Sequence, residues 1–124
     1  MKRVTGIGGI FFKAKDKEML LKWYEKHLGI PMESWGGAVL KWAENDPKKD
    51  ALTVFSIFPD TTKYLEPGKA NFMINFRVEN LDELIKTLKQ EGVELSGEPM
   101  EEFNGKFAWV IDPEGNKIEL WEPK

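Results

Sequence analysis

The most informative stretch of the sequence covers residues 107 to 121 and reads Phe107-Ala108-Trp109-Val110-Ile111-Asp112-Pro113-Glu114-Gly115-Asn116-Lys117-Ile118-Glu119-Leu120-Trp121. Two runs rich in apolar residues, 106–111 and 117–121, flank a polar segment at 112–116. This polar segment is a strong turn signal, because proline presets one backbone angle and glycine tolerates the left-handed region. The pattern therefore predicts an antiparallel β-hairpin.

The two faces of this hairpin differ in chemistry, because side chains on a strand alternate between faces. Closing the turn sets Trp109 opposite Glu119 and Phe107 opposite Trp121. The hairpin therefore predicts an aromatic surface that contains one carboxylate.

The residues before the hairpin predict a strand, a helix and a short strand. Phe72–Val78 has the composition of a strand, and Asn80 followed by Glu83 has the spacing of a helix capping box. Apolar residues then recur at helical spacing until Gly92, and a short strand follows at 93–95. The polar segment 101–106 is expected to be a mobile loop.

The first half of the chain repeats this order. A strand is expected at 6–14, a helix capped by Asp16 and stopped by Gly29, and short strands at 35, 38–43 and 51–58, the last two joined by a turn at 45–50. An offset of 64 residues superimposes Ile10 on Ile74, Phe12 on Phe76 and Asp16 on Asn80. The repeat predicts two β-α-β-β-β modules, about 5–58 and 70–124, joined by a polar linker at 59–69 within a single domain covering 1–124.

Composition excludes several classes of site. The chain has 124 residues, no cysteine and one histidine, so disulfides, zinc-thiolate sites and multi-histidine metal sites are absent. Eighteen basic and 21 acidic residues are spread without a basic cluster, which argues against a nucleic-acid partner. An apolar run long enough for a membrane span and a signal peptide are both missing, so we expect a cytoplasmic protein without a membrane partner.

These motifs resemble the vicinal oxygen chelate superfamily, also called the glyoxalase/bleomycin-resistance/dioxygenase superfamily. The resemblance rests on the Asp-Pro-x-Gly-Asn-x-Ile-Glu-Leu hairpin, on the strand-Asp-helix pattern of Gly9–Gly29, and on Phe76-Arg77-Val78 before the second helix. It implies an α+β fold in which two β-α-β-β-β modules form a cupped mixed sheet with helices on the outer face. It also implies a small-molecule ligand in the cup and a homodimer.

The usual chemistry of this superfamily needs a divalent metal held by residues at four matching strand positions. In this sequence the resemblance places Gly9, Thr53, Met73 and Glu119 at those positions. Glycine offers no side chain, and a thioether is a poor ligand for the metals concerned. A stable site needs several protein donors, so we expect no metal and no other cofactor.

Strand alternation assigns further side chains to the cup. Glu119 is the candidate catalytic residue, and the candidate ligand-binding residues are Phe11, Thr53, Phe55, Met73, Asn75, Phe107, Trp109 and Trp121. An alternative is that the aromatic residues fill the cup as a second core. In that case an indole N–H simply holds Glu119.

Two functions stay open from the sequence. The first is a metal-free protein, like the bleomycin-resistance branch, that binds an aromatic or amphipathic small molecule, with an amine or cation favoured by the carboxylate. The second is a glyoxalase-type lyase or another small-molecule enzyme, in which apolar walls raise the pKa of Glu119 and make it a general base. A purely regulatory domain is a third possibility, and whether the protein is an enzyme is left open.

Overall fold

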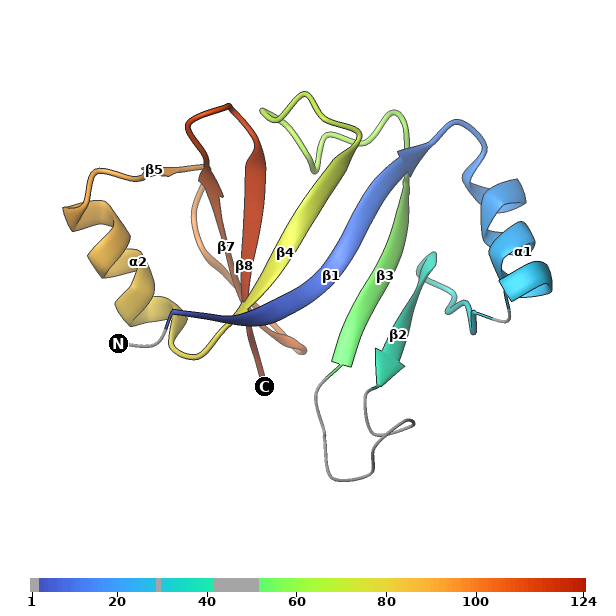
Figure 1. Ribbon diagram of the computed structural model, residues 1–124, viewed down its shortest axis with the longest axis horizontal. Helices are drawn as coiled ribbons and strands as arrows, with labels where there is room; N and C mark the ends of the chain where they lie inside the picture. Colours follow the sequence, from blue (N-terminus) through green and yellow to red (C-terminus); the bar gives the residue numbers. More distant parts are fainter. Residues whose placement is uncertain (1–2, 29, 42–51) are drawn as a thin grey trace.

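The computed structural model describes residues 3–28, 30–41 and 52–124, which form an eight-stranded mixed sheet and two helices (Figure 1). This confirms the predicted α+β fold class. The elements are β1 (Val4–Ala14), α1 (Lys17–Leu28), β2 (Gly37–Lys41), β3 (Leu52–Pro59), β4 (Phe72–Val78), α2 (Leu81–Gln90), β5 (Glu94–Leu95), β6 (Met100–Glu102), β7 (Gly105–Ile111) and β8 (Lys117–Pro123). The turn expected at 45–50 and the helix stop expected at Gly29 lie outside the described residues.

The sheet shows the repeat in its strand order. The strands lie side by side as β2-β3-β1-β4-β8-β7-β5, and β6 pairs with β7. β1 is parallel to β3, and in the same way β4 is parallel to β8. The antiparallel pair β1 and β4 joins the two halves at the centre, with α1 and α2 at opposite ends of the sheet (Figure 1).

Both helices begin where the sequence predicts. The Asp16 side chain accepts a hydrogen bond from the Met19 amide at 3.1 Å, and Asn80 accepts one from the Glu83 amide at 3.1 Å. Each bond satisfies an amide that the first turn of a helix leaves unpaired. The buried face of α2 then packs on β7 and β8 in one apolar cluster of the core, formed by Val78, Leu81, Leu84, Ile85, Ala108, Val110 and Leu120.

The opposite face of the sheet forms the cup. Its floor is a second apolar cluster of Phe11, Leu65, Met73 and Trp109, with Val54, Phe58 and Phe107 against it. The hairpin register is as predicted, because Trp109 pairs with Glu119 and Phe107 with Trp121. These four expected cup residues therefore lie on one hairpin. Its turn sets the strand register and so the face on which each side chain lies.

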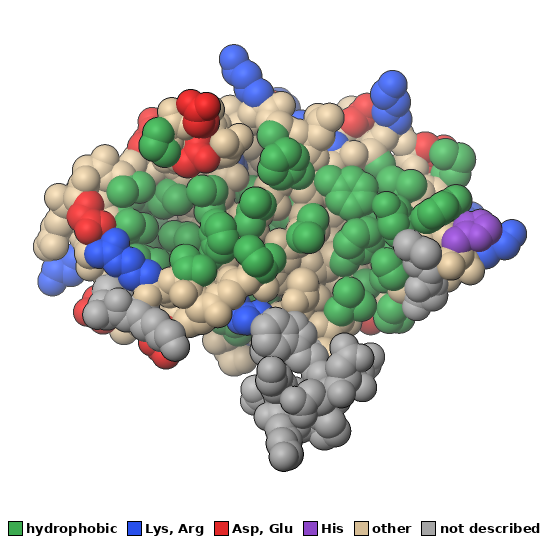
Figure 2. All heavy atoms as spheres, in the orientation of Figure 1, with side chains coloured by type: hydrophobic (Ala, Val, Ile, Leu, Met, Phe, Trp, Pro, Cys, Tyr) green, Lys and Arg blue, Asp and Glu red, His purple; other side chains and the backbone are tan. Residues whose placement is uncertain are grey.

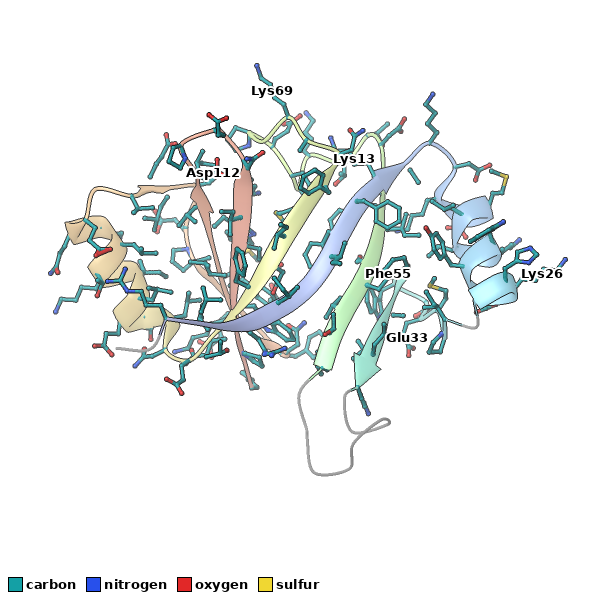
Figure 3. The ribbon with its side chains drawn as sticks, viewed as in Figure 1. Lys13, Lys26, Glu33, Phe55, Lys69 and Asp112 are labelled. Carbon is teal, nitrogen blue, oxygen red and sulfur yellow. The ribbon has the colours of Figure 1, made fainter. Side chains whose placement is uncertain are left out.

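The prediction of which β3 side chains face the cup is wrong, because the two faces of this strand are exchanged. The Phe55 ring lies 5.2 Å from the Tyr24 ring of α1 and 5.6 Å from the Phe12 ring, between β3 and α1 in Figure 3. By alternation Thr53 shares this helix-facing side, and the cup instead receives Val54, Ser56 and Phe58. The prediction assigns the faces of β3 by counting residues from the turn expected at 45–50. Such a count does not determine the strand register, and a register that differs by one residue reverses the two faces.

Two segments expected to be irregular take part in the core or the sheet. The 101–106 segment, predicted as a mobile loop, overlaps β6, where Met100 pairs with Phe107 and Glu101 with Lys106. The polar linker buries Leu65 in the floor of the cup, where its side chain is 1 % exposed. Trp35, expected in a strand, lies in the turn before β2. Among the described residues, neither helix is long and apolar enough to cross a bilayer.

Candidate functional site

The cup contains an open cavity of about 740 Å³. Both halves of the chain line it, mainly with aromatic and aliphatic side chains, including Phe11, Trp35, Val54, Phe58, Phe107 and Trp121. This volume lies within the range of about 300–1,000 Å³ that small-molecule sites occupy. The filled-core alternative therefore describes only the floor of the cup, where Phe11, Met73 and Trp109 pack against Leu65.

The buried carboxylate of Glu119 is held by three donors from three elements. Its Oε1 accepts hydrogen bonds from the Trp109 indole Nε1 at 3.0 Å and from the Tyr64 hydroxyl, and its Oε2 accepts one from Asn75 Nδ2 at 2.6 Å. Burial raises the pKa of Glu119, because its side chain is 1 % exposed, and the three donors oppose that rise. The alternative in which an indole N–H holds this residue is thus correct for Trp109.

Tyr64 is the main feature of the site that the sequence did not predict. It comes from the linker, its ring meets the Trp109 ring edge-on at 6.0 Å, and burial followed by the Glu119 charge raises the pKa of its phenol. The Lys117 ammonium donates to the Tyr64 backbone oxygen and lies 5.1 Å from the Tyr64 ring centre. The one available signal is the apolar pair Tyr64-Leu65 within a polar segment.

Asn75 is placed by the central strands. Its Nδ2 donates to Glu119, whereas its Oδ1 is buried with no hydrogen-bond partner in the described part of the chain. This oxygen lies against the backbone of Gly8, at an irregularity in the β1–β4 pairing, where a Cβ atom would collide with it. Glycine at position 8 therefore leaves the room in which the Asn75 amide can turn its nitrogen to Glu119.

The predicted site residues fall into three groups. Five of them line the cavity: Phe11, Asn75, Phe107, Glu119 and Trp121. Met73 and Trp109 lie on the cup face but form its floor, and Thr53 and Phe55 lie on the helix-facing side. The cavity also contains lining residues that were not predicted, among them Trp35, Val54, Ser56, Phe58, Tyr64 and Phe103.

The repeat identifies the true counterpart of Glu119 in the first half. Phe11 pairs with Ser56 on parallel strands, as Asn75 pairs with Glu119, and the 64-residue offset relates Phe11 to Asn75. The counterpart is therefore Ser56 and not Thr53. Its hydroxyl is a neutral group that borders the cavity from β3.

The residues at the expected metal positions do not fit a divalent metal. Met73 is packed in the apolar floor, Thr53 faces away from the cup, and both oxygens of Glu119 already accept hydrogen bonds. Over residues 3–28, 30–41 and 52–124, no three carboxylate or histidine side chains come together as a metal site would need.

The model of the Glyoxalase/Bleomycin resistance protein/Dioxygenase superfamily matches residues 6–120. The chain belongs to this superfamily. A curated relative, the uncharacterized protein YraH of Bacillus subtilis (strain 168), is 28% identical over 116 residues, which are 86% of this chain and 90% of the relative.

Solved structures of other proteins share the fold. Methylmalonyl-CoA epimerase from Mycobacterium tuberculosis superimposes with a TM-score of 0.63 at 23% identity, covering 98% of this chain and 89% of that one. A glyoxalase/bleomycin resistance protein/dioxygenase superfamily member from Vibrio splendidus 12B01 gives a TM-score of 0.56 at 12% identity, covering 91% and 95%. At these identities the likeness establishes the architecture of the cup and leaves its chemistry to the residues of this chain.

Proposed function

We propose that this superfamily protein is a metal-free binding protein that takes a small aromatic or amphipathic molecule into the cup. The supporting observation is an open apolar cavity beside a carboxylate whose oxygens are already occupied. Aromatic walls such as Phe107 and Trp121, whose rings stack 6.1 Å apart at 5°, offer a flat and rigid surface to a planar ligand.

Catalysis by Glu119 is the weaker alternative. A general base must reach the proton it abstracts, yet the Glu119 side chain is 1 % exposed and accepts three hydrogen bonds. The raised pKa of this carboxyl favours a base, but Tyr64 would first have to leave the carboxylate. Methylmalonyl-CoA epimerases occur among the structural neighbours, and their low identity carries no activity to this chain.

We also propose that the protein forms a homodimer through the helix-bearing face of the sheet. Apolar side chains spread over the face visible in Figure 2, and those of Ile7, Ile10, Phe72 and Ile74 are between 38% and 53% exposed on the central strands. An apolar area of this kind is typical of a protein interface. The cytoplasmic location stays a prediction of the sequence.

Binding can be tested by titrating the protein with a panel of planar aromatic molecules and following tryptophan fluorescence. We expect saturable quenching by at least one class of probe. Trp121→Ala should weaken binding by about 1–3 kcal/mol, as the loss of an aromatic anchor does. Trp23→Ala is the matched control, because Trp23 lies on α1, packed against Tyr24 and His27, and does not line the cavity.

A second variant separates lost binding from lost stability. Val54→Phe adds bulk on the cup face of β3 while leaving both indoles of the hairpin in place. We expect it to abolish quenching in a protein whose circular dichroism spectrum is native. Unchanged binding in folded Val54→Phe protein, or the lack of any binding probe, would refute the binding function. Catalysis would be supported instead if Glu119→Gln abolished a turnover while leaving binding intact.

A further inference from the structure

The sequence favours an amine or a cation as the ligand of the cup, but the structure removes the reason for that preference. The Glu119 carboxylate would attract a positive group only if an oxygen were open to it. Instead Tyr64, Asn75 and Trp109 each donate to it, and the side chain is almost fully buried. A cationic ligand would have to displace one of these charge-assisted hydrogen bonds, which are stronger than neutral ones.

The surroundings of Glu119 also supply positive charge. The Lys117 ammonium lies 5.1 Å from the Tyr64 ring centre and 5.3 Å from the Trp109 ring centre, and its field lowers the pKa of Glu119. Lys117 and Glu119 therefore offset each other at this end of the cup. The Glu119 end does not select for a ligand charge.

The opposite end of the cavity carries a positive charge of its own. Lys17, at the start of α1, lines the cavity together with Trp35 and Ser56. Its ammonium lies against Gly36, where a Cβ atom would collide with it, and Gly36 has a φ of 93° that favours glycine. Among the described residues Lys17 takes part in no ion pair.

Neighbouring groups complete this end as a site for an anion. Ser56 pairs with Gly37, the residue after Gly36, and Ser56 and Lys17 both line the cavity. Ser56 is 6 % exposed on the cup face, and a hydroxyl can donate a hydrogen bond to an anion. The Trp35 ring lies over Gly37 and adds an apolar wall beside the two polar groups.

We propose that the cup selects an amphipathic molecule with a negatively charged group, a carboxylate, sulfonate or phosphate, beside Lys17 and Ser56. This rests on the proposed binding function and names the charge of the ligand. The apolar body of the molecule lies along the sheet toward Phe107 and Trp121. The path from β3 over β1 and β4 to β8 crosses three strand spacings, or about 14 Å, which suits a molecule with several rings.

Two fluorescent probes that differ only in the anionic group provide the test. 8-Anilinonaphthalene-1-sulfonate carries a sulfonate, and N-phenyl-1-naphthylamine is the same molecule without it. At low ionic strength we expect the sulfonate probe to bind about three- to tenfold more tightly, the range of a partly exposed charge-assisted contact. Raising the salt concentration should reduce this preference. 1-Naphthaleneacetate and 1-naphthyl phosphate, used as competitors, then distinguish a carboxylate from a phosphate.

Variants assign the preference to the proposed residue. Lys17→Gln should bring the two probes to within about twofold of each other by weakening only the anionic one. Lys26→Gln is the matched control, because Lys26 is also on α1 but points away from the sheet at its far end (Figure 3). Equal binding of the two probes to the unmodified protein, or an equal effect of the two lysine variants, would overturn the proposal.

The outcomes also separate this inference from the binding function. If both probes bind equally and Val54→Phe abolishes both, the cup binds small molecules but does not select an anion. If Val54→Phe leaves binding of both probes unchanged, they bind outside the cup and the proposed function itself fails.

Discussion

Replacing Trp109 by phenylalanine tests the hydrogen-bonded arrangement around Glu119. The change removes the indole Nε1 that donates to Glu119 Oε1 at 3.0 Å and leaves a ring in the floor of the cup. A hydrogen bond to a charged group contributes about 1.5–3 kcal/mol, against about 0.5–1.5 kcal/mol between neutral groups. For a chain of this length 1 kcal/mol corresponds to about 4 °C in melting temperature.

The pH dependence of the free energy of unfolding lost in Trp109→Phe shows whether the bond partner is the Glu119 carboxylate. The pKa of Glu119 is raised in the folded protein above the ordinary value of 4.5, so the folded state binds more protons than the unfolded state. The free energy of unfolding therefore falls as the pH rises from that ordinary value through the raised pKa. Trp109→Phe removes a donor that lowers this pKa, so the pKa of Glu119 in the folded protein rises further and the total fall in the free energy of unfolding becomes larger. We expect the free energy lost by the variant to be about 1–2 kcal/mol larger at pH 9 than at pH 5 in urea unfolding.

Trp121→Phe provides the matched control for this experiment. It removes an equally buried indole, which donates to the Asn104 backbone oxygen at 3.0 Å instead of to a carboxylate. The free energy of unfolding lost in Trp121→Phe should be the same at pH 5 and pH 9. A pH-independent loss for Trp109→Phe, or the same pH dependence for both variants, would refute the assignment of the buried charge to Glu119.

Three further predictions concern the linker, the metal and the dimer. Leu65→Ala should lower the free energy of unfolding by about 2–5 kcal/mol, measured by urea titration, because it opens a cavity in the floor of the cup. Treatment with EDTA should leave the melting temperature unchanged, and elemental analysis showing one metal per chain, lost in Glu119→Gln, would contradict this. Sedimentation should give twice the chain mass of 14.3 kDa for the unmodified protein and the chain mass for Ile10→Lys. A monomer at micromolar concentration before any substitution would count against the dimer.

Local signals in the sequence determine the parts of the fold that can be predicted. The turn at Asp112–Asn116 fixes the register of β7 and β8, and the side chains of Asp16 and Asn80 fix the first turns of the helices. Each of these contacts spans only a few residues, so composition and spacing are sufficient. For the same reason the pairing of Trp109 with Glu119 follows from the hairpin turn alone.

Interactions between distant segments determine the rest. Tyr64 and Glu119 are 55 residues apart, and the linker sequence does not indicate that it turns back over the cup. The face predicted for Phe55 is wrong because a single-residue difference in strand register reverses both faces. β6 is short, exposed and rich in glutamate, so neither hydrophobic alternation nor composition distinguishes it from a loop.

The linker that carries Tyr64 and Leu65 has a consequence for how a guest molecule can lie in the protein. Two repeated halves alone would build a basin whose ends are nearly equivalent, and a molecule could enter it head first or tail first. Because the linker joins the halves once, its Tyr64 hydroxyl bonds to Glu119 of β8, and among the described residues no matching hydrogen bond is made to Ser56 of β3. The duplicated architecture thereby acquires a direction, so that one orientation of an elongated molecule is favoured over its reverse.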